Sequence, residues 1–154
     1  MTINEHDILN ALGEWGECLI SISKAYEEKG LNAARAMADQ TLDRLYAFDL
    51  GPVLFKPTLS GGADTFRPTK AGALAYFIGH DPKYPDDSGF GIKFWRKVRS
   101  ETSTTFIKND VAMWMGWVSL FDKNNAVLKV DKTFGNIRDK NGNLKIVLHH
   151  SSLP

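Results

Sequence analysis

Apolar and polar residues alternate in the first third of the chain with the period of an α-helix. Between residues 5 and 29 the apolar side chains recur every three or four positions and form one broad stripe, made of Ile8, Leu9, Leu12, Trp15, Leu19, Ile22 and Tyr26. Asn4 can cap the start of this helix, and Gly30 is a typical helix end. A second helix is expected to follow, with a buried side made of Ala34, Met37, Ala38, Leu42 and Leu45.

The pattern changes after residue 50, where prolines and glycines separate shorter apolar runs. The run from Val53 to Phe55 lies between Gly51-Pro52 and Pro57, which is typical of a short strand. Helical spacing returns after Pro68, so we expect a third, short helix between Arg67 and Gly79.

Residues from 90 onward show the alternation of half-buried strands. We expect four strands, and the Asn-Gly pair before the last one favours a hairpin; the strands lie at residues 90–99, 111–121, 126–138 and 144–150. Helices followed by consecutive strands predict an α+β fold, with the N-terminal helices packed in a strongly curved antiparallel sheet. Such a sheet forms a half-open cone, and the hollow of the cone is a natural place for a ligand.

The length and charge of the chain narrow the possible classes of function. Its 154 residues fit a single domain, which we expect to span residues 1–154. The 19 basic and 18 acidic residues give a net charge of only +1, so no nucleic-acid partner is predicted. The densest basic stretch, residues 93–99, alternates with apolar residues and is better explained as a strand with one wet side.

Three features predict a cytoplasmic location. The N-terminal residues carry acids rather than the basic and apolar segments of a secretory signal. No apolar run approaches the ~20 residues that span a bilayer, so we expect no membrane contact. The single cysteine, Cys18, can form no internal disulfide, which agrees with a reducing compartment.

The segment IVLHHSSLP, residues 146–154, places two histidines and two serines at the end of an apolar run. Alternate side chains of a strand point to opposite faces, so His149 and Ser151 share one face while His150 and Ser152 share the other. We predict that one of these pairs looks into the hollow. Adjacent histidines on a strand cannot bind the same metal ion, and zinc-binding spacings are absent, so we predict no metal ligands and no cofactor. A histidine near a strand end is, however, more often a structural hydrogen-bonding group than a catalyst.

Two near-copies of a short motif, FKPT at residues 55–58 and FRPT at residues 66–69, add hydroxyl groups to the candidates. Each motif places a threonine one residue after a proline and two residues after a cation. Thr69 is explained as the cap or first turn of the third helix. Thr58 could simply end a strand, but we consider it a candidate for the site.

The order of these motifs resembles that of the iota-class carbonic anhydrases. The resemblance rests on LYAFDLGPVLFKPT, TFRPTKAGALAYFIG, DSGFGIKFWRKVRSE and KVDKTFGNIRDKNGNLKIVLHHSSLP, and it covers nearly the whole chain. That family belongs to the nuclear transport factor 2-like superfamily and is related to the association domain of calcium/calmodulin-dependent protein kinase II. The resemblance implies reversible hydration of carbon dioxide to bicarbonate without a metal. It also implies that the bicarbonate is surrounded by Thr58, Tyr76, His149 and Ser151.

Without a metal, another group has to accept the proton that water loses. A serine or threonine hydroxyl is a poor base, whereas histidine titrates near neutral pH unaided. We therefore hypothesise that His149 accepts this proton, either directly or through Ser151. Thr58 and Tyr76 would hold the attacking water.

The same hypothesis assigns the walls of the pocket. Phe55 and Phe77 would form an apolar slot for carbon dioxide. Lys56 or Arg67 could stabilise the charge of bicarbonate if either side chain points inward, although long cations beside prolines usually reach solvent.

A noncatalytic role as a ligand-binding or assembly module of the kinase-association-domain type is the main alternative. The segment MWMGWVSLF, residues 113–121, departs from the usual pattern of the family, and its tryptophans either narrow the pocket or face opposite sides of the sheet. An uncovered sheet face with Trp95, Trp114 or Trp117 would favour oligomers under either function. We predict a homo-oligomer, with a dimer favoured.

Two other enzyme classes have weaker support. An isomerase or dehydratase generally needs a buried carboxylate as its base, and the candidates Asp43, Asp49 and Glu101 lie at element ends or in wet patterns. A cyclohydrolase with a cysteine-bound zinc ion is disfavoured because the chain has only Cys18.

Overall fold

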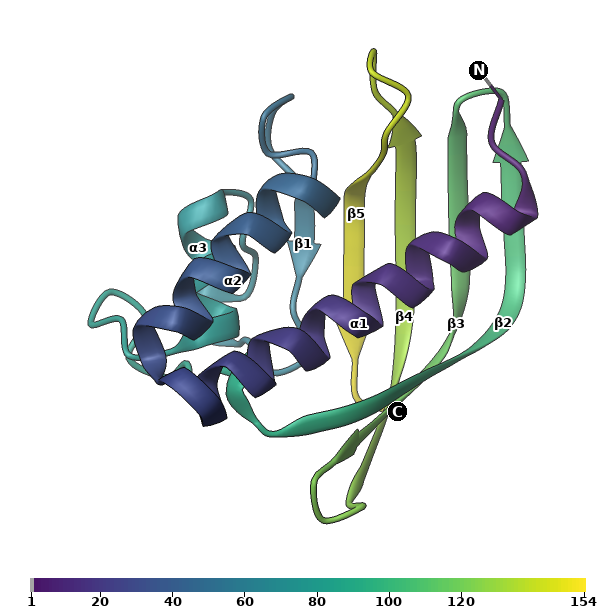
Figure 1. The fold of residues 1–154 in the computed structure, drawn as a ribbon. Helices are drawn as coiled ribbons and strands as arrows, with labels where there is room; N and C mark the ends of the chain where they lie inside the picture. Colours follow the sequence, from purple (N-terminus) through teal and green to yellow (C-terminus); the bar gives the residue numbers. More distant parts are fainter. Residues whose placement is uncertain (1) are drawn as a thin grey trace.

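The computed structural model describes residues 2–154 as three helices and a five-stranded sheet (Figure 1). The long helix α1 lies across one face of the curved sheet, and α2 and α3 lie beside the β1 edge. The elements are α1 (Glu5–Lys29), α2 (Leu31–Leu45), β1 (Leu54–Lys56), α3 (Lys70–Ile78), β2 (Trp95–Lys108), β3 (Val111–Asp122), β4 (Val127–Arg138) and β5 (Leu144–Ser152), with single turns of 3-10 helix at Gly62–Asp64 and Phe90–Ile92. The predicted α+β fold is confirmed.

The sheet is mixed rather than wholly antiparallel. Its strand order is β1-β5-β4-β3-β2, and β2 to β5 form the predicted antiparallel meander. The short strand β1 instead pairs in parallel with β5, with Leu54 opposite Leu148 and Lys56 opposite His150. This pairing places β5 inside the sheet, so that its side chains are held by a neighbouring strand on each side.

The predicted ends of the helices are confirmed. Asn4 Oδ1 accepts a hydrogen bond from the Asp7 backbone N–H, and the Asp7 carboxylate accepts one from the Asn4 N–H, which forms a capping box. Gly30 ends α1 with a φ of 92°, a conformation that favours glycine. Thr69 caps α3, where its hydroxyl accepts a hydrogen bond from the Gly72 N–H.

The prediction of a strand at residues 90–99 was wrong in its first half. Residues Phe90–Ile92 form a turn of 3-10 helix, and β2 begins only at Trp95. The indole N–H of Trp95 donates to the Phe90 carbonyl at 2.7 Å, which folds the segment back on itself. Gly89 has a φ of 86°, and a Cβ atom there would lie 2.6 Å from the Ile78 carbonyl oxygen, so only glycine fits where the chain enters this turn beside the end of α3.

The two faces of the sheet differ in burial. The face toward α1 is buried and includes Val130, Lys132 and Phe134 of β4. Trp114 and Trp117 of β3 point to opposite faces: Trp114 is buried, with its indole N–H on the Thr102 hydroxyl, and Trp117 is 38% exposed on the outer face. None of the helices described between residues 2 and 154 is long and apolar enough to cross a membrane, and the cytoplasmic location stays a prediction.

Candidate active site

A hollow lies between the sheet, α1 and α3, and its walls are mainly aromatic. The residues that line it are Trp15, Phe55, Pro57, Thr58, Tyr76, Phe77, Phe90, Lys132 and His149. The side chains fill the space between these walls so closely that no water molecule fits there. A substrate therefore enters only when side chains in the hollow move apart.

The hydroxyl groups of Thr58 and Ser151 meet in this region, although 93 residues separate them in the sequence. Their oxygen atoms are 2.5 Å apart, and both side chains are buried. The parallel pairing of β1 with β5 brings them together, because Thr58 follows β1 directly. Lys56 strengthens this junction, since its Nζ donates to the Ser151 carbonyl oxygen at 2.7 Å.

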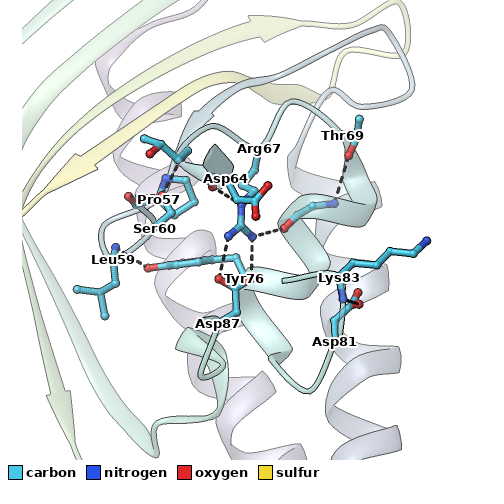
Figure 2. A network of polar contacts seen from close by, with 12 residues as sticks. Pro57, Leu59, Ser60, Asp64, Arg67, Thr69, Tyr76, Asp81, Lys83 and Asp87 are labelled. Atoms are coloured by element: carbon cyan, nitrogen blue, oxygen red, sulfur yellow. Dashed lines mark hydrogen bonds and ion pairs between the residues drawn. The ribbon is translucent and has the colours of Figure 1, made fainter. Parts of the chain in front are cut away.

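The Tyr76 hydroxyl completes the group of hydroxyls. It accepts a hydrogen bond from the Leu59 backbone N–H at 3.1 Å, so its own proton is free to be donated (Figure 2). Burial raises the pKa of Tyr76 far above its ordinary value, and its bonds with the Leu59 N–H and the Thr58 hydroxyl offset only part of that rise. The phenol is therefore protonated and can donate a hydrogen bond.

His149 lies at the centre of the hollow and is 2% exposed. Its ring is stacked between Phe55 and Phe134, with ring centroids 4.8 and 4.3 Å away. Its Nδ1 lies 2.8 Å from the Tyr46 hydroxyl, and its Nε2 lies 2.9 Å from Lys132 Nζ. Burial, followed by the charge of Lys132, lowers the pKa of His149 well below its ordinary value, so the imidazole is neutral.

This arrangement differs from the one hypothesised for His149. Both ring nitrogens have partners, and no hydrogen bond joins His149 to Ser151 or Thr58 within the described chain. The structure thus places His149 and Ser151 on one face, as the strand alternation predicts, but it does not show a proton path between them.

Lys132 is the site residue that the sequence-based reasoning missed. Its side chain is 2% exposed, and burial, followed by the charge of Lys56, lowers its pKa from 10.5 to about 7. It stands directly opposite Ser151 in the β4–β5 ladder, and Phe134 stands opposite His149. The alternation of Val130, Lys132 and Phe134 was a usable signal, because it puts a cation on the apolar side of a strand.

A chain of hydrogen bonds connects Lys132 to the helical layer. The Trp15 indole N–H donates to the Tyr46 oxygen at 3.0 Å, and Tyr46 contacts His149, which contacts Lys132. Two tautomers fit these contacts. With the ring proton on Nε2, Tyr46 donates to Nδ1 and Lys132 has to accept; with the proton on Nδ1, Tyr46 accepts and Lys132 donates to Nε2.

Arg67 does not line the hollow. Its guanidinium forms a bidentate ion pair with Asp87 at 2.7 and 2.8 Å, and it also donates to the carbonyl oxygens of Asp64 and Gly72 (Figure 2). The ring centroids of Tyr84 and Tyr76 lie 4.4 and 5.9 Å from its central carbon. The charge of Arg67 is thus compensated by Asp87, and its contacts join the turn at Asp64 and the segment at Asp87 to Gly72 of α3.

The remaining candidates divide into residues that line the hollow and residues that are exposed to solvent. Phe55 and Phe77 line the hollow with their rings stacked at 6.0 Å, as the predicted slot requires. The carboxylates that an isomerase would need, Asp43, Asp49 and Glu101, are all exposed. Among residues 2–154, no three or more histidine, cysteine or acidic side chains come together in a way that could hold a metal ion.

A curved sheet with a long helix across one face, and an aromatic hollow lined by hydroxyls, an imidazole and an amine, defines an α+β protein with a small polar site beneath its sheet. Comparison with known proteins narrows this class further. The chain belongs to the metal-independent carbonic anhydrase family, whose model matches residues 6–153. The resemblance noted in the sequence is thereby confirmed.

Individual relatives agree with this family. A metal-independent carbonic anhydrase from Nostoc sp. (strain PCC 7120) is 46% identical over 152 residues, which cover 99% of this chain and 74% of the relative. The crystal structure of a cyanobacterial iota-carbonic anhydrase complexed with bicarbonate matches with a TM-score of 0.98 and 46% identity, over 99% of this chain and 93% of that chain. A putative calcium/calmodulin-dependent protein kinase II association domain from Xanthomonas campestris matches with a TM-score of 0.59 and 21% identity, over 99% of this chain and 89% of that chain. This last match shows a shared fold alone.

Proposed function

We propose that this protein catalyses the reversible hydration of carbon dioxide to bicarbonate in the aromatic hollow, with Thr58, Ser151 and Tyr76 binding the oxygen atoms. The observation that carries the proposal is the 2.5 Å contact between the Thr58 and Ser151 hydroxyls, which lies beside the protonated phenol of Tyr76. The family and the bicarbonate complex of a relative with 46% identity support the choice of substrate.

The chemistry of the hydroxyls suits a small oxyanion. In the closed hollow, one of the Thr58 and Ser151 hydroxyls uses its proton to bond the other. A ligand that enters between them frees that donor, so three O–H groups, including that of Tyr76, can point at the oxygens of carbon dioxide or bicarbonate. Donors placed where negative charge develops lower the barrier most effectively in a water-poor site.

The apolar walls serve the other half of the reaction. Carbon dioxide carries no charge, and the stacked rings of Phe55 and Phe77 offer it a surface without competing hydrogen bonds. Lys56 and Arg67 contribute indirectly under this proposal, because their charged groups bind the Ser151 carbonyl and Asp87 and so keep the hydroxyls in place.

The test is the rate of carbon dioxide hydration by the purified protein, measured by isotope exchange or by stopped flow with a chelator present. We expect the wild-type protein to exceed the buffer rate, and Ser151→Ala to lose roughly 10² to 10³-fold, the usual loss when one such donor is removed. Tyr76→Phe should behave similarly. A wild-type rate no higher than buffer would refute the activity, and a rate that disappears with the chelator would refute a metal-free reaction.

Ser152→Ala is the matched control. Ser152 is the next residue on β5, but its hydroxyl donates to Asp131 at 2.7 Å on the other face of the sheet. The control should keep the wild-type rate and the same circular dichroism spectrum. Equal losses in the two serine variants would mean that the hollow is not the site.

We also propose that the protein forms a homodimer through the outer face of its sheet. That face carries a group of exposed apolar side chains on β2 and β3: Phe106 (56% exposed), Met113 (42%), Met115 (55%) and Trp117 (38%). Such a cluster is costly to leave in water and favours a second copy of the same face. Light scattering after size exclusion should give twice the monomer mass, and Met115→Glu should give the monomer; a monomeric wild type would refute the dimer.

A further inference from the structure

A purely structural role does not explain the position of Lys132. It faces the hollow from the middle of β4, directly opposite Ser151, and lines the same walls as Thr58 and Tyr76. No carboxylate lies within ion-pairing distance of its amine anywhere in residues 2–154. A long cation that is buried without a counter-ion costs stability, so its retention points to a function.

Burial and the nearby charge of Lys56 disfavour the charged form of Lys132. The neighbouring Asp131 points to the opposite face of the sheet, where it accepts a hydrogen bond from Ser152. His149 of β5 is neutral and Tyr76 of α3 is protonated, as described above, whereas Lys56 of β1 carries a positive charge. The rings of Trp15 and Phe134, 4.8 and 5.9 Å from the amine, attract the charged form, but burial outweighs them and lowers the pKa of Lys132 to about 7. In the free site, therefore, the amine is readily neutral near pH 7.

The same surroundings favour the charged form of the amine once bicarbonate has formed. Bicarbonate brings one negative charge into the hollow, and Arg67, the other buried cation beside α3, is already paired with Asp87. A protonated Lys132 would be the counter-ion that the hollow otherwise lacks. Proton uptake by Lys132 and formation of the anion thus stabilise each other.

Building on the proposed hydration of carbon dioxide, we propose that the Lys132 amine is the general base that takes the proton from the attacking water. In this step an O–H bond of water breaks, its oxygen forms a bond with the carbon of carbon dioxide, and the proton goes to Nζ. The site then holds bicarbonate and an ammonium group. Release of bicarbonate and loss of the proton to solvent restore the neutral amine.

His149 is a positioning residue in this scheme. The proposal assigns it the tautomer with hydrogen on Nδ1, in which Nδ1–H donates to the Tyr46 oxygen and Nε2 accepts from Lys132. The lone pair of the neutral amine is then free to face the hollow. Protonation adds one more N–H without disturbing the bond to His149. The Tyr46 oxygen then accepts both the Trp15 and His149 N–H groups, and its own O–H has no acceptor among the described residues.

The first experiment compares Lys132→Met with Lys145→Met in the exchange assay. Methionine fills similar space without a base, and we expect a loss of about 10² to 10⁴-fold in kcat, the usual contribution of a general base. Lys145 is a matched control because it is also buried on a central strand, but its amine donates to the Asp43 carbonyl outside the hollow. Its variant should keep the wild-type rate, and both should keep the native circular dichroism spectrum.

Lys132→Arg separates a base from a fixed charge. Arginine keeps the positive charge but does not release its proton in proteins. We expect this variant to be as inactive as Lys132→Met; a substantial rate would mean that only the charge matters, and it would overturn the proposal. Full activity of Lys132→Met in a protein whose Ser151→Ala variant is inactive would overturn the role of Lys132 while the proposed function stands.

A measurement on the wild-type protein gives a test that does not depend on folding of a variant. The Cε resonance of Lys132, assigned by its absence in Lys132→Met, should titrate near pH 7, and kcat/KM for hydration should rise over the same range. The ¹⁵N shifts of His149 should report hydrogen on Nδ1. Titration of Lys132 at the ordinary lysine value would overturn the proposal, whatever the activity.

Discussion

The substitution Asp87→Asn tests whether the buried ion pair beside the site holds the fold around Tyr76. Asparagine keeps the shape of the side chain but removes its charge. Arg67 stays charged in the variant, because a guanidinium does not release its proton in proteins. The variant therefore leaves a guanidinium in a site where its side chain is only 3% exposed and has lost its counter-charge.

The expected loss in the free energy of unfolding follows from this burial. Removal of one partner from a buried ion pair typically costs about 3 to 5 kcal/mol, because the remaining charge is neither paired nor solvated. For a domain of this size, each kcal/mol lowers Tm by roughly 2 to 4 °C, so the melting temperature should fall by roughly 6 to 20 °C. The contacts of Arg67 with the Asp64 and Gly72 carbonyls remain, which favours the lower half of that range.

Urea unfolding followed by tryptophan fluorescence measures this loss, with Asp39→Asn as the control. Asp39 also pairs with a cation, Lys70, at 2.9 Å, but the two side chains are 48% and 32% exposed. An exposed pair contributes about 0 to 1 kcal/mol, so the control should change little. A loss in Asp87→Asn no larger than that of the control would refute the reasoning.

Three further predictions concern stability. Because the pKa of Lys132 is lowered from 10.5 to about 7 in the folded state, the unfolded chain binds more protons between these values. Stability should then rise with pH above about 7, by at most about 1.4 kcal/mol per pH unit, and a urea series at pH 7 and 9 should show this gain in the wild type but not in Lys132→Met. Gly116→Ala should destabilise the protein by about 1 to 3 kcal/mol or more, because its Cβ atom would lie 2.2 Å from the Glu101 carbonyl oxygen. Gly13→Ala, on the exposed side of α1 with nothing within 4 Å, should instead raise Tm through a gain of about 0.5 to 1 kcal/mol, and a lower Tm would contradict this account.

The features that the sequence predicted well are those that depend on neighbouring residues. Helix ends are set by the chemistry of one or two side chains, and Asn4, Gly30 and Thr69 act where their residue types suggest. The inward direction of His149 and Ser151 follows from strand alternation, which is also local. The motifs that carried the family resemblance are short and follow one another in a fixed sequence order, so they could be recognised without knowledge of the fold.

The features that were missed depend on distant partners. The parallel pairing of β1 with β5 leaves no trace in the apolar pattern, because that pattern gives the face of a strand and not the direction of its neighbour. Phe90 and Ile92 alternate like strand residues, yet they are buried by a turn that closes onto Trp95. In the sequence, Lys132 and Arg67 look like ordinary cations that face solvent. Only the fold shows that Lys132 lies opposite Ser151 and that Arg67 is paired with Asp87.

The pairing of β1 with β5 also determines the order in which the strands come together during refolding. The meander of β2 to β5 can assemble from segments that are neighbours along the chain, whereas β1 can join only after a loop of some 90 residues closes, as the Thr58 to Ser151 separation of 93 residues indicates. Contacts of such high sequence separation are slow to form. Recovery of catalysis after dilution from denaturant should accordingly lag behind recovery of secondary structure, and intermediates with an almost complete sheet should be inert.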